Sequence, residues 1–114
     1  MINVRVERKL NKQISSFTMS GHANAGPYGY DLVCAGASAV SFGAVNAIDA
    51  LCHVQLDVEM EDDGGFLRCI IPSHLDSDTH EKVQLLLDGM IVSLQSIAEQ
   101  YSEHIKVIET TGGE

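Results

Sequence analysis

Apolar and polar residues alternate in two stretches near the start of the chain. Residues 2–8 (INVRVER) place an apolar side chain at every second position, which is typical of a half-buried strand. After a turn at 10–13 (LNKQ), residues 14–21 (ISSFTMSG) bring Phe17 and Met19 to one face. The pattern therefore predicts two strands that pair as an antiparallel hairpin.

The middle of the chain predicts a helix and a second hairpin. Residues 35–52 are rich in alanine, and their larger apolar residues recur at steps of two or three positions, which predicts a helix. Those residues are Val40, Phe42, Val45, Ile48 and Leu51. Residues 54–60 (VQLDVEM) then alternate strictly, 61–65 (EDDGG) have turn composition, and 66–71 (FLRCII) read as a second strand.

The last third predicts a long helix and a closing strand. The helix begins near 75–82 (LDSDTHEK), where Ser77 or Asp78 can act as the N-cap and Glu81 can complete a capping box with Asp78. One apolar stripe follows over about five turns. It consists of Val83, Leu86, Leu87, Met90, Ile91, Leu94, Ile97, Ala98 and Tyr101. Residues 105–109 (IKVIE) predict a short strand and 110–114 a frayed tail.

The order strand, strand, helix, strand, strand, helix, strand indicates an α+β fold. We expect a two-layer domain with a mostly antiparallel sheet of about five strands packed against two helices. With 114 residues, the chain is expected to form a single domain over residues 1–114.

Composition and charge narrow the function classes. The net charge of −9 repels phosphate backbones, so no direct contact with nucleic acid is expected. Continuous apolar runs are short, as at 85–87 (LLL), and residues 1–10 do not resemble a signal peptide; no membrane span and a cytoplasmic location are expected. The three cysteines, none in a CxxC spacing, predict reduced thiols.

The candidate chemistry lies in residues 21–36, GHANAGPYGYDLVCAG. Cys34 stands where the loop passes into the predicted helix, and the positive end of a helix stabilises a thiolate. The free backbone amides near Ala35 and Gly36 are candidate donors to an oxyanion. Two further side chains have supporting roles: Asp31 would orient a histidine or a substrate amine, and Ser38 shares the helix face of Cys34.

His22 is the candidate base for this thiol. It follows the second predicted strand, and Gly21, Gly26 and Gly29 give the intervening loop the freedom to open and close over a site. Spacing alone also fits a strand-end histidine and a buried cysteine with no catalytic role. The tyrosines of the loop, Tyr28 and Tyr30, fit either an aromatic subsite or an exposed surface.

The stretch 21–40, GHANAGPYGYDLVCAGASAV, closely resembles the signature of the bacterial ribosomal-processing cysteine protease family called Prp. That signature is a Gly-His-Ala block, a variable loop, an Asp-x-Val-Cys-Ala block and a nearby serine. The segments FGAVNA (42–47), EDDGG (61–65) and LLLDGMIVSLQSIAEQY (85–101) also look like the family's, so the resemblance covers nearly the whole chain.

The resemblance implies a cysteine endopeptidase with His22 and Cys34 as the catalytic dyad and no metal or cofactor. Asp31 and Ser38 also match the signature, with roles assigned as support. The implied substrate is the short N-terminal extension of bacterial large-subunit ribosomal protein 27, cut after a pair of aromatic residues and before a small one, as ribosome assembly requires. The expected assembly is a homodimer.

Two rival classes remain open at this stage. One is a metal-binding or redox protein that uses Cys34, His22 and Asp31, although a third and fourth ligand at the usual spacing are missing. The other is a non-catalytic, dimeric ribosome-assembly module in which Cys34 is dispensable.

Overall fold

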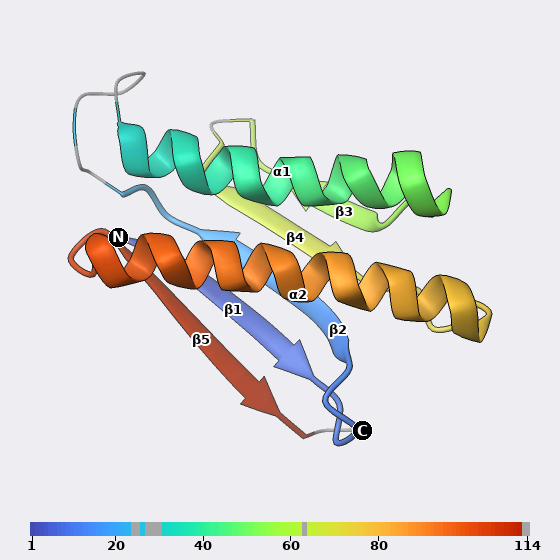
Figure 1. Ribbon diagram of the computed structural model, residues 1–114. Coiled ribbons are helices and arrows are strands. Elements are labelled where there is room, and N and C mark those ends of the chain that lie inside the picture. Colours follow the sequence, from blue (N-terminus) through green and yellow to red (C-terminus); the bar gives the residue numbers. More distant parts are fainter. Residues whose placement is uncertain (24–25, 27–30, 63, 113–114) are drawn as a thin grey trace.

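A computed structural model describes residues 1–23, 26, 31–62 and 64–112, which form one five-stranded sheet with two helices on the same face (Figure 1). The strands are β1 (Ile2–Arg8), β2 (Ile14–Ser20), β3 (Asp57–Met60), β4 (Phe66–Ile70) and β5 (Ile105–Thr111). The helices are α1 (Leu32–Cys52) and α2 (Ser77–Gln100). The expected two-layer α+β architecture is confirmed.

The sheet order is β3-β4-β2-β1-β5. Both predicted hairpins are present, since β1 pairs with β2 and β3 with β4 in antiparallel fashion, and β2 joins the hairpins by pairing antiparallel to β4. The exception is β5, which runs parallel to β1 from the Ile2–Ile105 pair to the Arg8–Thr111 pair. The sheet is therefore mixed, although most of its pairs are antiparallel.

The core lies between the sheet and the helices. Val4, Val6 and Phe17 of the first hairpin are fully buried, and α2 covers them with its predicted apolar stripe. On that stripe Val83, Leu87, Met90, Ile91 and Leu94 are buried, whereas Tyr101 is exposed.

The predicted core face of α1 is wrong in part. The residues that α1 buries are Val33, Ala37, Ser41 and Ile48, whereas Phe42 and Leu51 are exposed. Small side chains on the inner face allow close packing, and the buried Ser41 hydroxyl lies 2.9 Å from the Met19 sulfur on β2. Ile48 is thus the one predicted core residue of α1 that is fully buried, whereas Val40 and Val45 pack against the core only in part.

Both helices begin at a different residue from the prediction because their N-caps were not recognised, and two strands also have different bounds. Helix α1 begins at Leu32, three residues early, because Asp31 is its N-cap. Helix α2 is capped by Asp76, whose side chain accepts from the Thr79 amide at 3.2 Å, so the Asp78–Glu81 box is not the cap. Strand β3 begins only at Asp57, and β5 extends to Thr111 into the expected tail.

Two polar side chains fix the helix layer to the sheet. Buried Gln84 of α2 accepts from the Ile14 amide at 2.8 Å and donates to the Ile14 carbonyl at 2.9 Å, so it satisfies a backbone position at the start of β2. Arg8 at the end of β1 contacts Asp88 of α2 at 3.0 Å and Glu109 of β5 at 2.9 Å. These contacts hold the end of the molecule opposite to the start of α1 (Figure 1).

Candidate active site

Cys34 is the third residue of α1, and its side chain is half-buried. Asp31 builds this end of the helix: its Oδ1 accepts from the Cys34 amide at 3.0 Å, and its carbonyl accepts from the Ala35 amide at 2.9 Å. Aspartate is a preferred N-cap because its carboxylate satisfies an amide that has no intrahelical acceptor. The cap therefore places the thiol in the first turn, where the helix dipole is positive.

The Asp31 cap changes the expected set of oxyanion donors. The Ala35 amide already donates a hydrogen bond to the Asp31 carbonyl. Gly36 lies further into the helix, where each amide bonds to the carbonyl four residues back. Helix geometry leaves the amides of Leu32 and Val33 without an intrahelical acceptor. The amides that helix geometry leaves free thus lie earlier in the helix than the sequence analysis expected.

The other two cysteines lie away from the start of either helix. Cys69 is buried in β4, where burial raises the pKa of its thiol to about 12 and the negative charge of Asp57 adds to the rise. Cys52 is half-buried at the far end of α1. All three cysteines are free, and only Cys34 lies at a helix start.

His22 follows β2 by two residues, and its backbone is held on both sides. The preceding Gly21 has a φ of +89°, and its amide donates to the Gly65 carbonyl at 2.9 Å. The His22 carbonyl accepts from the nitrogen of Met1 at 2.6 Å. The carbonyl of buried Ala23 lies 2.9 Å from Nδ1 of His104. Contacts from distant parts of the chain thus position the segment that carries His22.

The end of β2 and the start of α1 lie at the same end of the molecule (Figure 1), which brings the segments bearing His22 and Cys34 to one region. Ser38 lies four residues beyond Cys34 on α1 and is half-buried, and Gly26 is an exposed bend residue. The expectations for Gly29, Tyr28 and Tyr30 lie outside the described residues.

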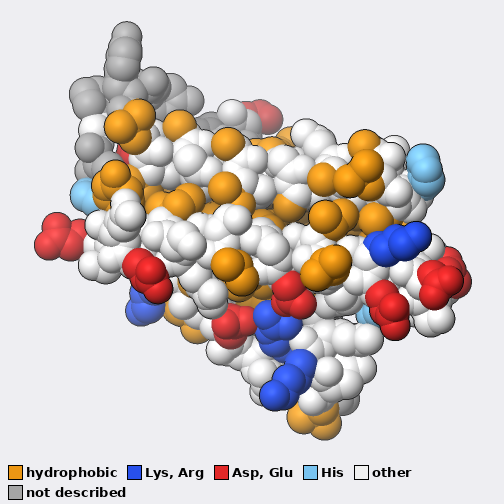
Figure 2. Space-filling view, viewed as in Figure 1, with side chains coloured by type: hydrophobic (Ala, Val, Ile, Leu, Met, Phe, Trp, Pro, Cys, Tyr) orange, Lys and Arg blue, Asp and Glu red, His pale blue; other side chains and the backbone are white. Residues whose placement is uncertain are grey.

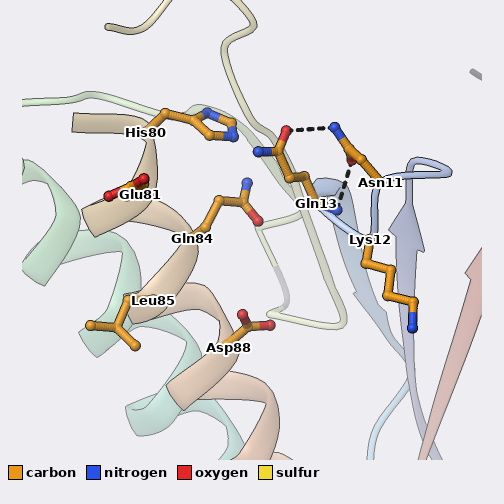
Figure 3. Close-up of a pocket in the computed structure, with 8 residues that line it drawn as sticks. All are labelled: Asn11, Lys12, Gln13, His80, Glu81, Gln84, Leu85 and Asp88. Atoms are coloured by element: carbon orange, nitrogen blue, oxygen red, sulfur yellow. Dashed lines mark hydrogen bonds between the residues drawn. The ribbon is translucent and has the colours of Figure 1, made fainter. Parts of the chain in front are cut away.

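A surface pocket of about 310 Å³ opens at the opposite end, between the β1–β2 turn and the first turns of α2 (Figure 3). Lys12, Glu81 and Asp88 bring both signs of charge to its lining, and the turn is braced by hydrogen bonds between Asn11 and Gln13. The Nε2 atom of His80 is buried here without a hydrogen-bond partner. None of the candidate catalytic residues lines this pocket.

Two further observations concern a metal site and a membrane span. Within residues 1–23, 26, 31–62 and 64–112, no three His, Cys, Asp or Glu side chains gather closely enough to hold a metal ion. By length and composition alone, α1 resembles a helix that could cross a membrane, a test that core helices of globular proteins also pass. The sequence analysis expected no membrane span because continuous apolar runs are short. Helix α1 has a high mean hydropathy although its apolar positions are interrupted by polar ones, so run length alone does not detect it.

Sequence reasoning missed the contacts that hold His22. The Asp31 cap could have been predicted from the sequence, since an aspartate three residues before Cys34 is well placed to accept a hydrogen bond from the Cys34 amide. The contacts from Met1 and His104 to residues 22 and 23 could not be predicted from the sequence, because they join parts of the chain that only the sheet brings together.

An α+β domain with a free cysteine in the first turn of a helix, and a histidine held at the neighbouring strand end, has the features of a cysteine protease. A model of the family described as cysteine protease Prp matches residues 1–106. The chain belongs to the Prp family of cysteine proteases.

Named relatives agree with this assignment. The ribosomal processing cysteine protease Prp of Bacillus subtilis is 44% identical over 107 residues, which cover 94% of this chain and 96% of the relative. The protein of the same name from Staphylococcus aureus is 43% identical over 109 residues, covering 94% and 97%.

Solved structures agree as well. The S. aureus Prp crystal structure with a covalently linked product peptide superposes with a TM-score of 0.88 at 39% identity, covering 96% of this chain and 100% of the other. A second structure of that protein, with a substrate peptide, gives a TM-score of 0.81 at 38% identity with the same coverage.

Proposed function

We propose that this protease uses Cys34 as nucleophile and His22 as base to process a ribosomal protein. The observation that carries the dyad is the capped first turn of α1, which presents Cys34 at the positive end of a helix. His22 would take the thiol proton or pair with the thiolate, and Cys34 would attack the scissile carbonyl. Water then releases the acyl-enzyme, and no metal or cofactor takes part.

The amides at the start of α1 stabilise the oxyanion in this proposal. Those of Leu32 and Val33 are favoured over Ala35 and Gly36, because the Ala35 amide is engaged with Asp31. Asp31 supports the reaction by holding the turn that carries Cys34, and Ser38 supports it from the next turn of the same helix face.

The proposed substrate is the N-terminal extension of large-subunit ribosomal protein 27, cut after aromatic residues and before a small one. Two relatives are named ribosomal processing proteases, and one was crystallised with a substrate peptide. The net charge of −9 favours encounter with a basic ribosomal protein. The proposed site of action is the cytoplasm, where ribosomal proteins are assembled.

Peptide cleavage tests this substrate. A peptide that copies the extended N-terminus of the host's ribosomal protein is expected to give a single cut, read by mass spectrometry. A matched peptide with both aromatic residues before the cut replaced by alanine is expected to be cleaved at least about 100-fold more slowly, because each lost aromatic contact removes a large buried area. Equal cleavage of both peptides would contradict the aromatic specificity, and no cleavage of either would favour a non-catalytic assembly module.

The proposal includes a homodimer formed through the outer face of α1. This helix has one charged residue, Asp49, among its 21 residues, and it exposes Leu32, Phe42 and Leu51. Apolar side chains line this helix in the space-filling view, whereas charged side chains gather on and below α2 (Figure 2). Because two chains of charge −9 repel each other, an uncharged face is the favourable place for them to meet.

A charge placed on this face tests the dimer. The native chain is expected to have twice the monomer mass of 12.3 kDa in light scattering, and Leu51→Glu is expected to shift it to the monomer mass. Leu85→Glu on α2 is the matched control, since Leu85 is 72% exposed and Leu51 69%. A native chain of monomer mass, or equal dissociation by both variants, would contradict the α1 interface.

A further inference from the structure

We infer that His104 is a positioning residue for the reaction and holds the backbone that carries His22. The inference rests on the proposed roles of His22 and Cys34. It concerns a residue 81 positions away from Ala23 in the chain that lies outside the 21–40 signature.

The backbone of His104 is fixed before its ring makes any contact. The turn after α2 is closed by the Tyr101 carbonyl, which accepts from the amides of His104 at 2.8 Å and Ile105 at 3.1 Å. The His104 carbonyl in turn accepts from the Ile2 amide at 2.8 Å, next to the first pair of the parallel β1–β5 ladder. The ring therefore projects from a rigid point at the edge of the sheet.

The ring contacts the residue that directly follows His22. Its Nδ1 lies 2.9 Å from the carbonyl oxygen of Ala23, which is 1% exposed. A carbonyl oxygen can only accept, so Nδ1 is the protonated nitrogen and donates. Because Ala23 is buried, its carbonyl has little access to water, so loss of this hydrogen bond would leave a buried acceptor unsatisfied.

Two consecutive carbonyls after the end of β2 are thus held by residues that are distant in the chain. The His22 carbonyl is bound by the nitrogen of Met1 and the Ala23 carbonyl by His104. The His22 carbonyl belongs to the peptide between residues 22 and 23, and the Ala23 carbonyl belongs to the next peptide. Together the two contacts orient the backbone that follows His22, and this orientation limits the direction in which the His22 side chain leaves the backbone. Small errors in the placement of a base cost large factors in rate, so a group that fixes this backbone acts on the chemical step.

Two substitutions at position 104 distinguish the effect of the hydrogen bond to Ala23 from the effect of side-chain size. His104→Asn keeps a donor, because the amide nitrogen of asparagine is as many bonds from Cα as Nδ1 of histidine. His104→Asp has the same shape but presents an acceptor to the Ala23 carbonyl. We expect kcat for peptide cleavage to stay within about threefold of native in the Asn variant and to fall about 10- to 100-fold in the Asp variant, with KM nearly unchanged in both. His74→Ala, at an exposed histidine, is the neutral control.

A readout independent of the ribosomal substrate is the rate of Cys34 alkylation by iodoacetamide across pH, measured in a Cys52→Ala background. His22→Ala is expected to slow alkylation near neutral pH, and His104→Asp to slow it in the same pH range. In the double variant, the effect of His104→Asp is expected to disappear, because His104 acts through His22. Thermal unfolding of each variant confirms that the compared chains are folded.

The outcomes separate the two hypotheses. If His22→Ala slows alkylation but His104→Asp matches His104→Asn in both rates, the dyad stands and the role of His104 is overturned. If His22→Ala leaves alkylation and cleavage unchanged, the dyad itself is wrong. If His104→Asp slows alkylation equally with and without His22, His104 acts as a general structural residue and the inference is overturned. Should His104→Asp not fold, His104→Ala is compared with His104→Asn in its place.

Discussion

Replacing Cys34 by alanine is expected to reduce peptide cleavage by on the order of 10³-fold or more, because removal of a nucleophile eliminates the covalent route. The side chain is half-buried and lies in the first turn of a capped helix, so the variant is expected to fold as the native chain does. Cleavage is measured by mass spectrometry over time at matched enzyme concentration, with circular dichroism as the check of folding.

Cys52→Ala is the matched control, because Cys52 is also half-buried and also lies in α1, at the opposite end of the helix. It is expected to cleave at the native rate within about twofold, as is usual for substitutions away from a reaction centre. Cleavage by Cys34→Ala at a rate comparable with that of Cys52→Ala would refute the assignment of the nucleophile.

Replacing Gly21 by alanine is expected to lower the free energy of unfolding by about 2–4 kcal/mol, because two penalties coincide. The φ of +89° disfavours any side chain, and a Cβ at this position would lie 2.4 Å from the carbonyl oxygen of Met1. The displaced backbone includes the next residue, His22, so kcat is also expected to fall more than about tenfold in conditions where the variant is folded.

Gly64→Ala separates the two penalties. Gly64 has a φ of +77°, but its Cβ would meet nothing within 4 Å, so only the backbone term of about 1–2 kcal/mol applies. Urea unfolding of both variants gives the comparison. Equal losses of stability at positions 21 and 64 would show that the contact with Met1 is not a constraint.

Local patterns in the sequence were sufficient to predict most of the fold. Alternation and turn composition located both hairpins, and the apolar stripe of α2 located the main core contact, because each is a short-range property of the chain. The direction of β5 is different in kind: its parallel pairing with β1 joins residues about 100 positions apart, and no local pattern encodes it.

For the candidate site, the sequence predicts the two main residues and the class of chemistry. The signature in residues 21–40 names His22 and Cys34, and the family assignment agrees with the cysteine-protease chemistry. The N-cap at Asp31 and the bond from the Ala35 amide to its carbonyl were not predicted, because the predicted helix began three residues late. The contact between His104 and Ala23 depends on the closure of the sheet, so residue spacing carried no trace of it.

The parallel pairing of β1 with β5 also has a consequence for the order in which the protein matures during synthesis. β1 and β2 emerge from the ribosome early, but one edge of β1 stays without a partner until residues 105–111 have been made. His104 is translated just before that strand, so the contact to Ala23 forms only when almost all of the described chain has been synthesised. With the proposed roles of His22 and His104, proteolytic competence is expected only after residues 104–111 have been translated, because a nascent chain that stops before them lacks the contact to Ala23.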